Sequence, residues 1–378
     1  VQDTILPTAV CQDLTVHLDA SGNASITASQ IDNGSSDNCG IFSLVLSQSA
    51  VTCADVGANT ITLQVTDNNG NISSCNATVT VLDTISPVAT CVAPFVIQLD
   101  GSGNASITAA QVDAGSSDAC GIQSLSVSPN TFTCADFGNN TVTLTVTDNN
   151  GNVSTCTTTV TVQDTILPTA SCVAPFVVQL DASGNASITA SQVDNGSTDN
   201  CGIFSLSVSP STFTCSDFGN NTVVLTVTDN NGNISTCSTI VTVQDTITPT
   251  ALCQNITTYL DASGNATITA SQIDNGSFDN CGIFSLALAQ STFTCGDVGT
   301  NTVVLTVTDN NGNISTCSSV ATVLDTINPV ITCPPTANLT ADAGLCTSNG
   351  SIGTATATDN CAGVNVSGPV PAGPYPVG

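Results

Sequence analysis

Aspartate side chains are the groups in this 378-residue chain whose type and spacing could do chemistry. All 28 acidic residues are Asp, and the chain has no Lys and no Arg to neutralise them. Carboxylates without cationic partners bind a metal ion, stay hydrated or repel one another. Six of them recur in register along the chain; in the first copy they are Asp3, Asp19, Asp32, Asp37, Asp55 and Asp67.

Two short loops place oxygen-bearing side chains at alternate positions. Asp19–Asn23 reads Asp-Ala-Ser-Gly-Asn, and Asp67–Asn71 reads Asp-Asn-Asn-Gly-Asn. Oxygen ligands at alternate positions with a Gly at the bend resemble the start of a calcium loop. The same residues also favour an ordinary turn, because Asn, Asp and Gly tolerate left-handed backbone conformations. No Glu follows as a bidentate ligand, which argues against a tight site.

The composition excludes most other chemistry. Without Lys or Arg, a chain of net charge −28 cannot neutralise DNA, RNA or an anionic membrane surface. The single histidine, His17, cannot supply a multi-histidine metal site or a catalytic triad in every copy, and we expect it on an exposed strand. Paired carboxylates could serve glycoside hydrolysis, but an aromatic content of 3% is too low to line a sugar cleft. We therefore predict that the protein is not an enzyme.

Nineteen cysteines predict disulfides. Zinc is the alternative, but CxxC pairs and repeated histidine ligands are both missing. Disulfides persist in oxidising compartments, so the protein is predicted to be extracellular, at a cell surface. The sequence contains no apolar run of about 20 residues that could span a membrane, and no signal peptide is recognisable.

The chain is an array of similar repeats. The string Asp-Thr-Ile begins at residues 3, 83, 164, 245 and 325, and four cysteines follow each of the first four occurrences at matching positions. This period divides the chain into repeat 1 (1–82), repeat 2 (83–163), repeat 3 (164–244), repeat 4 (245–324) and a partial repeat 5 (325–378).

Each repeat is predicted to be a small immunoglobulin-like β-sandwich, so the fold class is all-β. In Asn140–Asp148, apolar residues alternate with Thr, which is the period of a half-buried strand. Asp148–Asn152 predicts a hairpin turn and Val153–Val162 the returning strand. About seven strands per repeat are expected, with others near Phe176–Leu180, Ala186–Ala190 and Ile203–Val208. We expect the recurring Phe132, Phe213 and Phe293 in the cores.

The junctions between repeats carry no flexible linker. Val162–Thr169 runs directly from the last strand of repeat 2 into repeat 3, and Pro168 restricts both itself and Leu167. A short apolar junction with Pro favours an extended, semi-rigid rod. Each repeat would add roughly 35–45 Å, and the chain would span roughly 150–200 Å.

The sandwich topology brings carboxylates of two repeats to one junction. The loop after the first strand lies at the C-terminal end of its repeat, and the last hairpin lies at the N-terminal end of the next. Calcium is therefore the cofactor that the sequence suggests. The candidate ligands are Asp19, Asn23, Asp67, Asn69, Asn71, Asp83, Asp113, Asp118, Asp148, Asn150, Asn152, Asp164, Asp229, Asp245 and Asp309.

Two disulfides are predicted within each complete repeat. The first strand of a sandwich runs parallel to the last, which brings Cys11 beside Cys75, and a hairpin-like segment would then bring Cys39 beside Cys53. Four cysteines allow three pairings, so this is one of three alternatives. The predicted pairs are Cys11–Cys75, Cys39–Cys53, Cys91–Cys156, Cys120–Cys134, Cys172–Cys237, Cys201–Cys215, Cys253–Cys317 and Cys281–Cys295. We expect Cys333 to be unpaired, with a partner beyond Gly378.

Repeat 5 resembles a known family. It reads Asn-Pro-Val-Ile-Thr-Cys-Pro-Pro over 328–335, Asp-Ala-Gly-Leu-Cys over 342–346 and Ala-Thr-Asp-Asn-Cys over 357–361. These motifs resemble the hyalin (HYR) repeat, an immunoglobulin-like module. Repeats 1–4 look like divergent relatives found in large secreted proteins of Bacteroidetes-type bacteria, but they lack an equivalent of Cys346 and carry the Cys53-type cysteine instead. The resemblance implies the fold and a role in stalks or adhesive arms.

The recurring Asp-Thr-Ile string also resembles the O-glycosylation sequon of Bacteroidetes. The resemblance implies a glycan on Thr4, Thr84, Thr165, Thr246 and Thr326. The alternative is that these threonines pack at the junctions.

The function predicted from these observations is a non-enzymatic stalk segment of a large bacterial surface adhesin or filament, stiffened by disulfides and calcium. Near-identical repeats favour length and stiffness over a unique binding site. Two alternatives remain: a self-assembling extracellular fibre subunit, and binding modules appended to a secreted hydrolase. The expected partners are neighbouring repeats, other copies of the chain or surface glycans.

Overall fold

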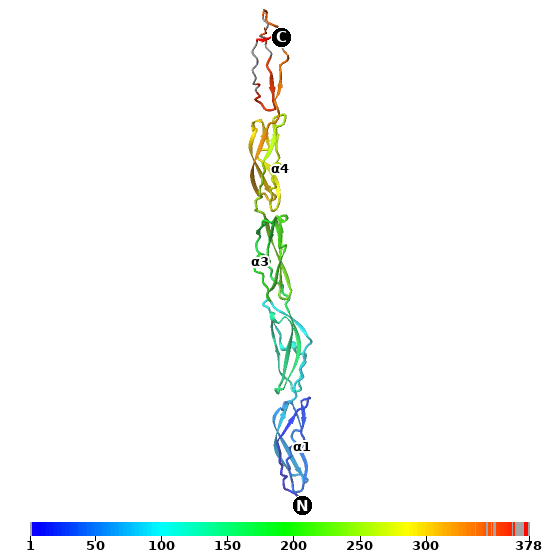
Figure 1. The fold of residues 1–378 in the computed structure, drawn as a ribbon. Coiled ribbons are helices and arrows are strands. Elements are labelled where there is room, and N and C mark those ends of the chain that lie inside the picture. The colour runs from blue at the N-terminus through cyan, green and yellow to red at the C-terminus, as the bar shows by residue number, and fades with distance from the viewer. Residues whose placement is uncertain are drawn as a thin grey trace. The chain divides into compact units, whose positions relative to one another are not determined.

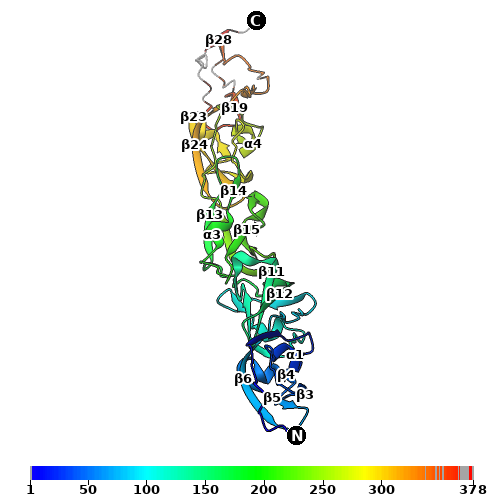
Figure 2. The ribbon, with the colours of Figure 1, turned by 90° about the horizontal axis from the view of Figure 1, so that it is seen from below.

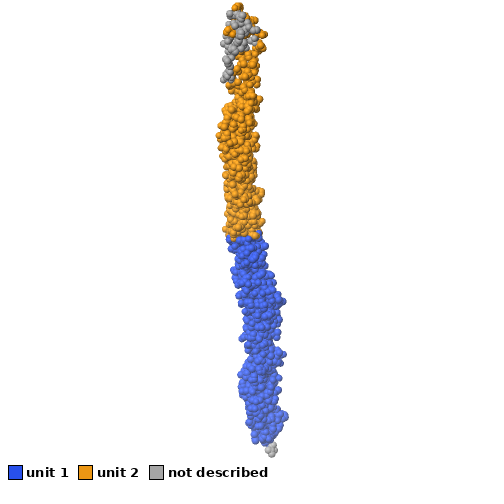
Figure 3. Space-filling model, viewed as in Figure 1, with its two compact units in different colours: residues 1–170, 196–206, 226–235 blue, residues 171–195, 207–225, 236–378 orange. Residues whose placement is uncertain are grey.

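A computed structural model describes residues 2–336, 338–344, 347–348, 350, 353–364, 366 and 374–376. Cys346, which carries part of the resemblance in repeat 5, lies outside these residues. The described chain forms two compact units (Figure 3). Unit 1 contains residues 1–170, 196–206 and 226–235, and unit 2 contains residues 171–195, 207–225 and 236–378. Repeats 1 and 2 belong to unit 1, repeats 4 and 5 belong to unit 2, and repeat 3 contributes residues to both.

Repeat 1 shows the pattern that the others follow. Strands β1, β6, β5 and β3 form one sheet in that order, and β2 pairs with β4 in a second sheet. Strand β1 is parallel to β6, while β5 is antiparallel to both of its neighbours. Strands β3, β4, β5 and β6 are labelled in Figure 2. The elements are β1 (Leu14–His17), β2 (Asn23–Ser25), α1 (Ala28–Ile31), β3 (Ile41–Leu46), β4 (Ala50–Thr52), the 3₁₀ turn η1 (Cys53–Asp55), β5 (Gly57–Asp67) and β6 (Ile72–Leu82).

The same order of elements recurs in repeats 2 to 4, whose single-turn helices α3 and α4 are labelled in Figure 1. Repeat 2 contains β7 (Phe95–Gln98), β8 (Asn104–Ser106), α2 (Ala109–Val112), β9 (Ile122–Ser128), β10 (Thr131–Thr133), η2 (Cys134–Asp136), β11 (Gly138–Asp148) and β12 (Val153–Gln163). Repeat 3 contains β13 (Phe176–Gln179), β14 (Asn185–Ser187), α3 (Ala190–Val193), β15 (Ile203–Ser209), β16 (Thr212–Thr214), η3 (Cys215–Asp217), β17 (Gly219–Asp229) and β18 (Ile234–Gln244). Repeat 4 contains β19 (Ile256–Tyr259), β20 (Asn265–Thr267), α4 (Ala270–Ile273), β21 (Ile283–Leu288), β22 (Thr292–Thr294), η4 (Cys295–Asp297), β23 (Gly299–Asp309) and β24 (Ile314–Leu324).

The described part of repeat 5 contains two short antiparallel pairs. Strand β25 (Val330–Thr332) pairs with β27 (Thr356–Thr358), and β26 (Thr347–Ser348) pairs with β28 (Tyr375–Pro376).

The alternating sequence of β11 explains its place in the sandwich. Val142, Leu144 and Val146 have no exposed surface, and the Thr residues between them face the other side of the sheet. The predicted strand, hairpin and returning strand are all present, because β11 pairs antiparallel with β12 from Gly138 opposite Val162 to Thr147 opposite Val153. The predicted all-β, immunoglobulin-like class is confirmed.

The cores lie between the two sheets of each repeat. Phe132, Phe213 and Phe293 are each 1% exposed, so the prediction that they are core residues is confirmed. Repeat 1 has six strands rather than about seven, because the segment before β1 makes only isolated bridges, at Thr8 with Ser36 and at Cys11 with Asp32. Of the residues predicted as a strand at Ala186–Ala190, the first two end β14, Ile188 and Thr189 lie in the connection, and Ala190 begins α3.

The four described α-helices are single turns of four residues, and no described helix has the length or apolarity needed to cross a membrane.

Candidate functional site

The disulfides form two sets. One set closes each repeat, and its members are Cys11–Cys75, Cys91–Cys156, Cys172–Cys237 and Cys253–Cys317. The other set joins consecutive repeats, and its members are Cys53–Cys120, Cys134–Cys201, Cys215–Cys281 and Cys295–Cys361. Eight disulfides require an oxidising compartment, which fits a secreted or extracellular protein. We call the second set the junction disulfides.

The predicted pairs Cys39–Cys53, Cys120–Cys134, Cys201–Cys215 and Cys281–Cys295 were wrong. The reason is that Cys39 and Cys53 lie at opposite ends of β5. The backbone carbonyl of Cys39 accepts a hydrogen bond from Asn68, just after the end of β5. Cys53 begins the turn whose Asp55 carbonyl accepts a hydrogen bond from Asn59, near the start of β5. Eleven residues of strand hold the two cysteines about 35 Å apart.

In each junction disulfide, the cysteine of the earlier repeat, which we call the outgoing cysteine, is held by a capped 3₁₀ turn. In repeat 2, the Thr133 amide donates to Asp136 Oδ2 at 2.8 Å, and the Ala135 amide donates to Thr133 Oγ1 at 3.3 Å. The side chain of Asn140 then donates to the Asp136 carbonyl at 2.6 Å and ties the turn to β11. These contacts fix the backbone of Cys134.

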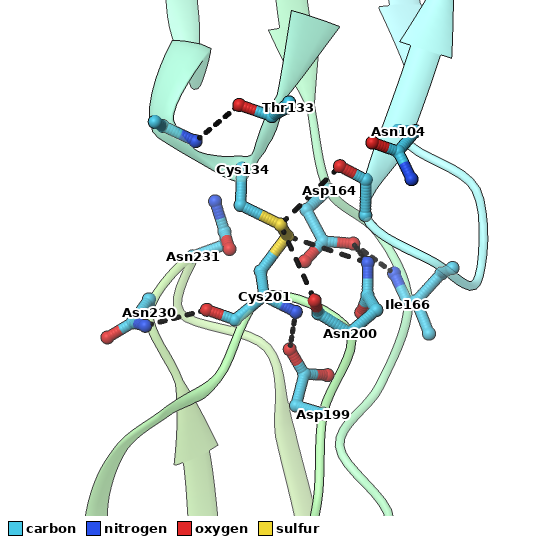
Figure 4. Close-up of a disulfide and its surroundings, with 12 residues drawn as sticks. Asn104, Thr133, Cys134, Asp164, Ile166, Asp199, Asn200, Cys201, Asn230 and Asn231 are labelled. Carbon is cyan, nitrogen blue, oxygen red and sulfur yellow. Dashed lines mark hydrogen bonds between the residues drawn. A yellow bond between two sulfur atoms is a disulfide. The ribbon is translucent and has the colours of Figure 1, made fainter.

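The cysteine of the later repeat, which we call the incoming cysteine, is held through both its backbone amide and its backbone carbonyl. The Cys201 amide donates to Asp199 Oδ2 at 2.7 Å, and the Cys201 carbonyl accepts from Asn230 Nδ2 at 2.7 Å (Figure 4). Asn200 donates to the carbonyl of Asp100 in the preceding repeat at 3.2 Å and to Asp164 Oδ1 at 3.3 Å. Cys201 also packs against the hydrophobic core of repeat 2, so the junction disulfide closes the end of that core.

Gly103 leaves the space that this disulfide needs. A Cβ at Gly103 would lie 2.6 Å from Cys134 Sγ and 2.9 Å from the Asn200 carbonyl oxygen, and the residue has a φ of +75°. Gly115 in the same repeat has a φ of +95°, but a Cβ there would meet nothing within 4 Å. Substitutions at the two glycines can therefore separate the free-energy cost of a positive φ from the cost of steric crowding.

We expect Gly103→Ala to prevent quantitative formation of Cys134–Cys201, because the added methyl group meets both a fixed sulfur and a backbone carbonyl. Gly115→Ala should keep the disulfide and lose only about 1–2 kcal/mol to backbone strain. Mass spectrometry after cleavage before Asp residues measures the cross-linked peptide. Equal amounts of it in both variants would show that the close approach at Gly103 is unimportant.

The Asp-Asn-Asn-Gly-Asn hairpin anchors the start of its own repeat. Asp148 is fully buried, and its Oδ1 accepts the amides of Asn150 and Asn152 at 2.8 Å. Burial opposes the charge, but the hydrogen bonds from Asn152 and Asn150 outweigh it and hold the pKa of Asp148 below its ordinary value. The Asn152 side chain donates to the Asp83 carbonyl at 3.2 Å. The loop thus makes the contacts of an ordinary turn and also fastens the inter-repeat segment.

Acidic groups gather at the N-terminal end of each complete repeat. One ligand atom from each member lies within 4.8 Å of the others in four described clusters. The clusters are Asp3, Asp37 and Cys39; Asp83, Asp118 and Cys120; Asp164, Asp199 and Asp229; and Asp245, Asp279 and Asp309. The first two clusters each include a cysteine, and that of the second cluster is in a disulfide. Of the four described clusters, the third and fourth consist of carboxylates alone.

The candidate ligands divide between these clusters and other places. Asp83, Asp118, Asp164, Asp229, Asp245 and Asp309 lie in the clusters. The other candidate carboxylates, Asp19, Asp67, Asp113 and Asp148, lie outside all four of the described clusters. The candidate asparagines Asn23, Asn69, Asn71, Asn150 and Asn152 donate their backbone amides to the carboxylate of their own loop. Asp199 and Asp279 were not among the candidates, although their equivalent Asp37 was visible among the six recurring Asp residues.

The loops of the Asp19 type use their oxygens internally. Asp19 Oδ1 accepts the amides of Ser21 at 2.8 Å and Asn23 at 3.1 Å, and the loop is exposed. Asp113 likewise accepts the Ser116 amide at 2.9 Å. These residues have the contacts of ordinary turns.

Mutual repulsion is visible within the cluster of repeat 4. Burial raises the pKa of Asp279 above its ordinary value, and the negative charges of Asp309 and Asp245 raise it further, against the lowering effect of the Cys281 amide. The negative charges of the three carboxylates therefore oppose one another.

Two cysteines in the described chain are exposed and free, Cys39 and Cys333. A hydrogen bond to Asp3, burial, and the charges of Asp3, Asp37 and Asp67 raise the pKa of the Cys39 thiol. Cys39 occupies the position that carries the incoming cysteine in the later repeats.

We expect alkylation of the oxidised chain to modify Cys39 and Cys333 and none of the sixteen disulfide cysteines. Cys39 should need a higher pH than an ordinary thiol, and Asp3→Asn should speed its reaction by removing an acceptor and a charge. Peptide mapping before and after reduction locates the label. Label on Cys53 or Cys120 before reduction would contradict the junction pairing.

The threonines of the Asp-Thr-Ile strings, Thr4, Thr84, Thr165, Thr246 and Thr326, are all exposed. Exposure leaves their hydroxyl groups accessible to modification. His17 is exposed on β1, and its Nδ1 lies 3.5 Å from Thr84 Oγ1.

No family model and no curated protein matches the sequence. Solved structures that match include Sidekick-1 immunoglobulin domains 1–5, at 10% identity and a TM-score of 0.31, covering 84% of this chain and 80% of that one. The titin I-band fragment I67–I69 matches at 11% identity and a TM-score of 0.31, covering 64% of this chain and all of the fragment. The protocadherin γB4 extracellular domain matches at 13% identity and a TM-score of 0.28, covering 95% and 74%. We draw no functional conclusion from these likenesses.

Proposed function

We propose that this chain is a non-enzymatic structural stalk segment of a large extracellular bacterial surface adhesin or filament. The observation that carries the proposal is the set of four junction disulfides, each of which joins one repeat to the next. A protein whose parts only needed to be tethered would be connected by its backbone alone. Covalent bonds added between successive repeats resist bending and pulling at each junction.

Non-covalent contacts support the same role. Asn200, Asn280 and Asn360 each donate to a backbone carbonyl of the preceding repeat, at 3.2–3.3 Å. The incoming cysteines Cys120, Cys201 and Cys361 pack against the core of the preceding repeat. In the described chain, three of the four junctions therefore add apolar contact to the disulfide, and three add a hydrogen bond.

The finer identity follows from the sequence motifs. The repeats are relatives of the HYR module, with boundaries at the Asp-Thr-Ile strings, and the stalk belongs to a secreted protein of a Bacteroidetes-type bacterium. Calcium at the junctions and glycans on the exposed Asp-Thr-Ile threonines complete the stalk. Its partners are neighbouring repeats, other copies of the chain or surface glycans, without nucleic acid or membrane insertion.

One observation favours a second function, the self-assembling fibre subunit. Phe42, Phe204 and Phe284 are 73–74% exposed and lie on β3, β15 and β21, each at the edge of its four-stranded sheet. An exposed aromatic residue on an edge strand suits lateral contact between chains. The equivalent residue of repeat 2 is Gln123, so the contact would be interrupted there.

Small-angle scattering with sedimentation tests both functions on the oxidised chain. A stalk gives a monomer with a radius of gyration of about 45–55 Å, which corresponds to a rod of roughly 150–200 Å. A compact monomer, with a radius of about 21 Å for this length, would defeat the stalk proposal. Concentration-dependent association that Phe204→Ser with Phe284→Ser abolishes would instead support the fibre subunit.

A further inference from the structure

Unpaired oxygens meet at the acidic clusters of repeats 3 and 4. Asp164 is 5% exposed, and its Oδ2 is a buried atom with no hydrogen-bond partner among the described residues. Its Oδ1 is fully engaged, by the amide of Ile166 at 3.1 Å and by Asn200. A buried carboxylate oxygen without a donor costs free energy that a bound cation would recover.

Other buried oxygens beside Asp164 also lack a hydrogen-bond donor. Asp199 Oδ2 accepts the Cys201 amide, but Asp199 Oδ1 is buried and unpartnered. Asn231 Oδ1, at the middle of the last hairpin, is also buried and unpartnered. Asp229 supplies the third carboxylate of the cluster. Figure 4 shows Asp164, Asp199 and Asn231 around the Cys134–Cys201 disulfide, with Asn231 and Asp164 on opposite sides of the sulfur atoms in this view.

Repeat 4 repeats this arrangement atom for atom. Asp245 is 5% exposed with an unpartnered Oδ2, and Asp279 Oδ1 and Asn311 Oδ1 are likewise buried without a partner in the described chain. Asp309 completes the cluster. The sequence around these residues is nearly the same in the two repeats, with Asp-Asn-Cys-Gly at 199–202 and 279–282 and Asp-Asn-Asn-Gly-Asn at 229–233 and 309–313, so both repeats carry the same set of oxygens.

We propose that repeats 3 and 4 each hold one calcium ion, bound by Asp164, Asp199, Asp229 and Asn231 in repeat 3 and by Asp245, Asp279, Asp309 and Asn311 in repeat 4. The ligands are all oxygens, and they come from carboxylates and an amide, which is the set that Ca²⁺ prefers. The three carboxylates of each set offer oxygens within 4.8 Å of one another, which fit around an ion with bonds of about 2.4 Å, since opposite ligands are then about 4.8 Å apart. Mg²⁺ requires a smaller and stricter octahedron.

The ion joins three segments that meet at the junction. Asp164 lies where the chain enters repeat 3, Asp199 precedes the incoming Cys201, and Asp229 and Asn231 belong to the last hairpin. The site lies beside the junction disulfide. Asp229 also caps its own hairpin, because its Oδ1 accepts the Asn231 and Asn233 amides, so the oxygens without a partner come from Asp164, Asp199 and Asn231. The Asp19-type loops contribute no buried unpartnered oxygen in the described chain. The inference rests on the proposed function only where it assigns the calcium to a stalk. The site itself does not depend on the stalk, because all four of its ligands come from one repeat.

The test uses the full oxidised chain, freed of metal and then dialysed against Ca²⁺ at about 1 mM, the range of extracellular sites. Elemental analysis counts the bound calcium in the parent chain and in Asp199→Asn, Asn231→Ala and Asp181→Asn. Asp181 is the matched control, because it lies in the Asp19-type loop of the same repeat and its Oδ1 accepts the Ser183 and Asn185 amides. Retention of Cys134–Cys201 in every variant verifies folding.

We expect at least two ions in the parent chain and in Asp181→Asn, and one fewer in Asp199→Asn and in Asn231→Ala. Loss of the ion in Asp181→Asn with retention in Asp199→Asn would place calcium in the other loop and overturn the inference. A parent chain that binds no calcium under these conditions would also overturn it. If a chain that binds no calcium still scatters as a rod, the stalk proposal holds and only the calcium site is rejected. If the chain binds calcium but scatters as a compact particle, the calcium site is supported and the stalk proposal is rejected.

Discussion

Pulled from its ends in the oxidised state, the chain should lengthen by only about 15–20 Å for each repeat that unfolds. The junction disulfides create a covalent path that crosses repeat 2 through the short segment from Cys120 to Cys134. That segment, about 14 residues long, reaches at most about 50 Å when fully extended. The folded repeat already spans about 36 Å along its 11-residue strands, so little hidden length remains.

The disulfides that close each repeat supply a second path of similar length. Cys91–Cys156 bypasses most of repeat 2, and a short segment then leads from Cys156 to Cys172, where the next closing disulfide begins. Removing either set alone should therefore leave the chain nearly inextensible. Removing both exposes about 80 residues per repeat, with an added length of about 250 Å.

Single-molecule force measurements distinguish these cases through the length gained per unfolding event. The comparison needs the oxidised parent chain, a variant with Ser at Cys53, Cys134, Cys215 and Cys295, and the fully reduced parent. Steps of about 250 Å in the oxidised parent, the length of a freely extended repeat, would contradict the two covalent paths. Long steps in the Ser variant would show that the closing disulfides do not carry load.

Replacing Phe132 with Ala should destabilise repeat 2 by about 3–5 kcal/mol. Phe132 is 1% exposed in β10, opposite Ala105 of β8, and packs in a core that includes Leu144 and Val160. Truncation removes its transfer free energy and leaves a cavity that the surrounding strands cannot fill. A small sandwich depends on a few such residues, so this loss is a large share of its stability.

Hydrogen exchange measured along the oxidised chain detects the effect repeat by repeat, because an array of repeats does not unfold as one unit. Exchange in β11 and β12 should accelerate, while β23 and β24 of repeat 4 keep their protection. Phe137→Ala is the control, since Phe137 lies nearby but is 52% exposed and should change stability by less than about 0.5 kcal/mol. Equal effects of the two substitutions would refute the assignment of Phe132 to the core.

The strands and the hairpins could be predicted because their signals are local. The alternation of Val142, Leu144 and Val146 with Thr requires no knowledge of the rest of the fold, and Asn-Gly in Asp148–Asn152 specifies its own turn. The period of Asp-Thr-Ile likewise revealed the repeats. The strand and turn signals depend on residues that are close neighbours in the chain.

The junction disulfides could not be predicted in this way. Whether Cys53 meets Cys39 or Cys120 depends on which end of the sandwich each one occupies, and 11 residues of β5 decide that. The acidic cluster was missed in part for the same reason. Asp199 recurs in register, but its role becomes visible only when three segments meet around an unpaired Asp164 oxygen.

The junction disulfides also set an order of maturation. During synthesis or export, Cys53 reaches the oxidising compartment 67 residues before Cys120, its partner. Until that partner arrives, repeat 1 can fold and close Cys11–Cys75, but the Cys53 thiol at its C-terminal end stays unpaired, in addition to the free thiol of Cys39. Each repeat therefore gains its junction disulfide only when the next repeat arrives. A chain whose export stalls would keep an unpaired junction cysteine in its last exported repeat.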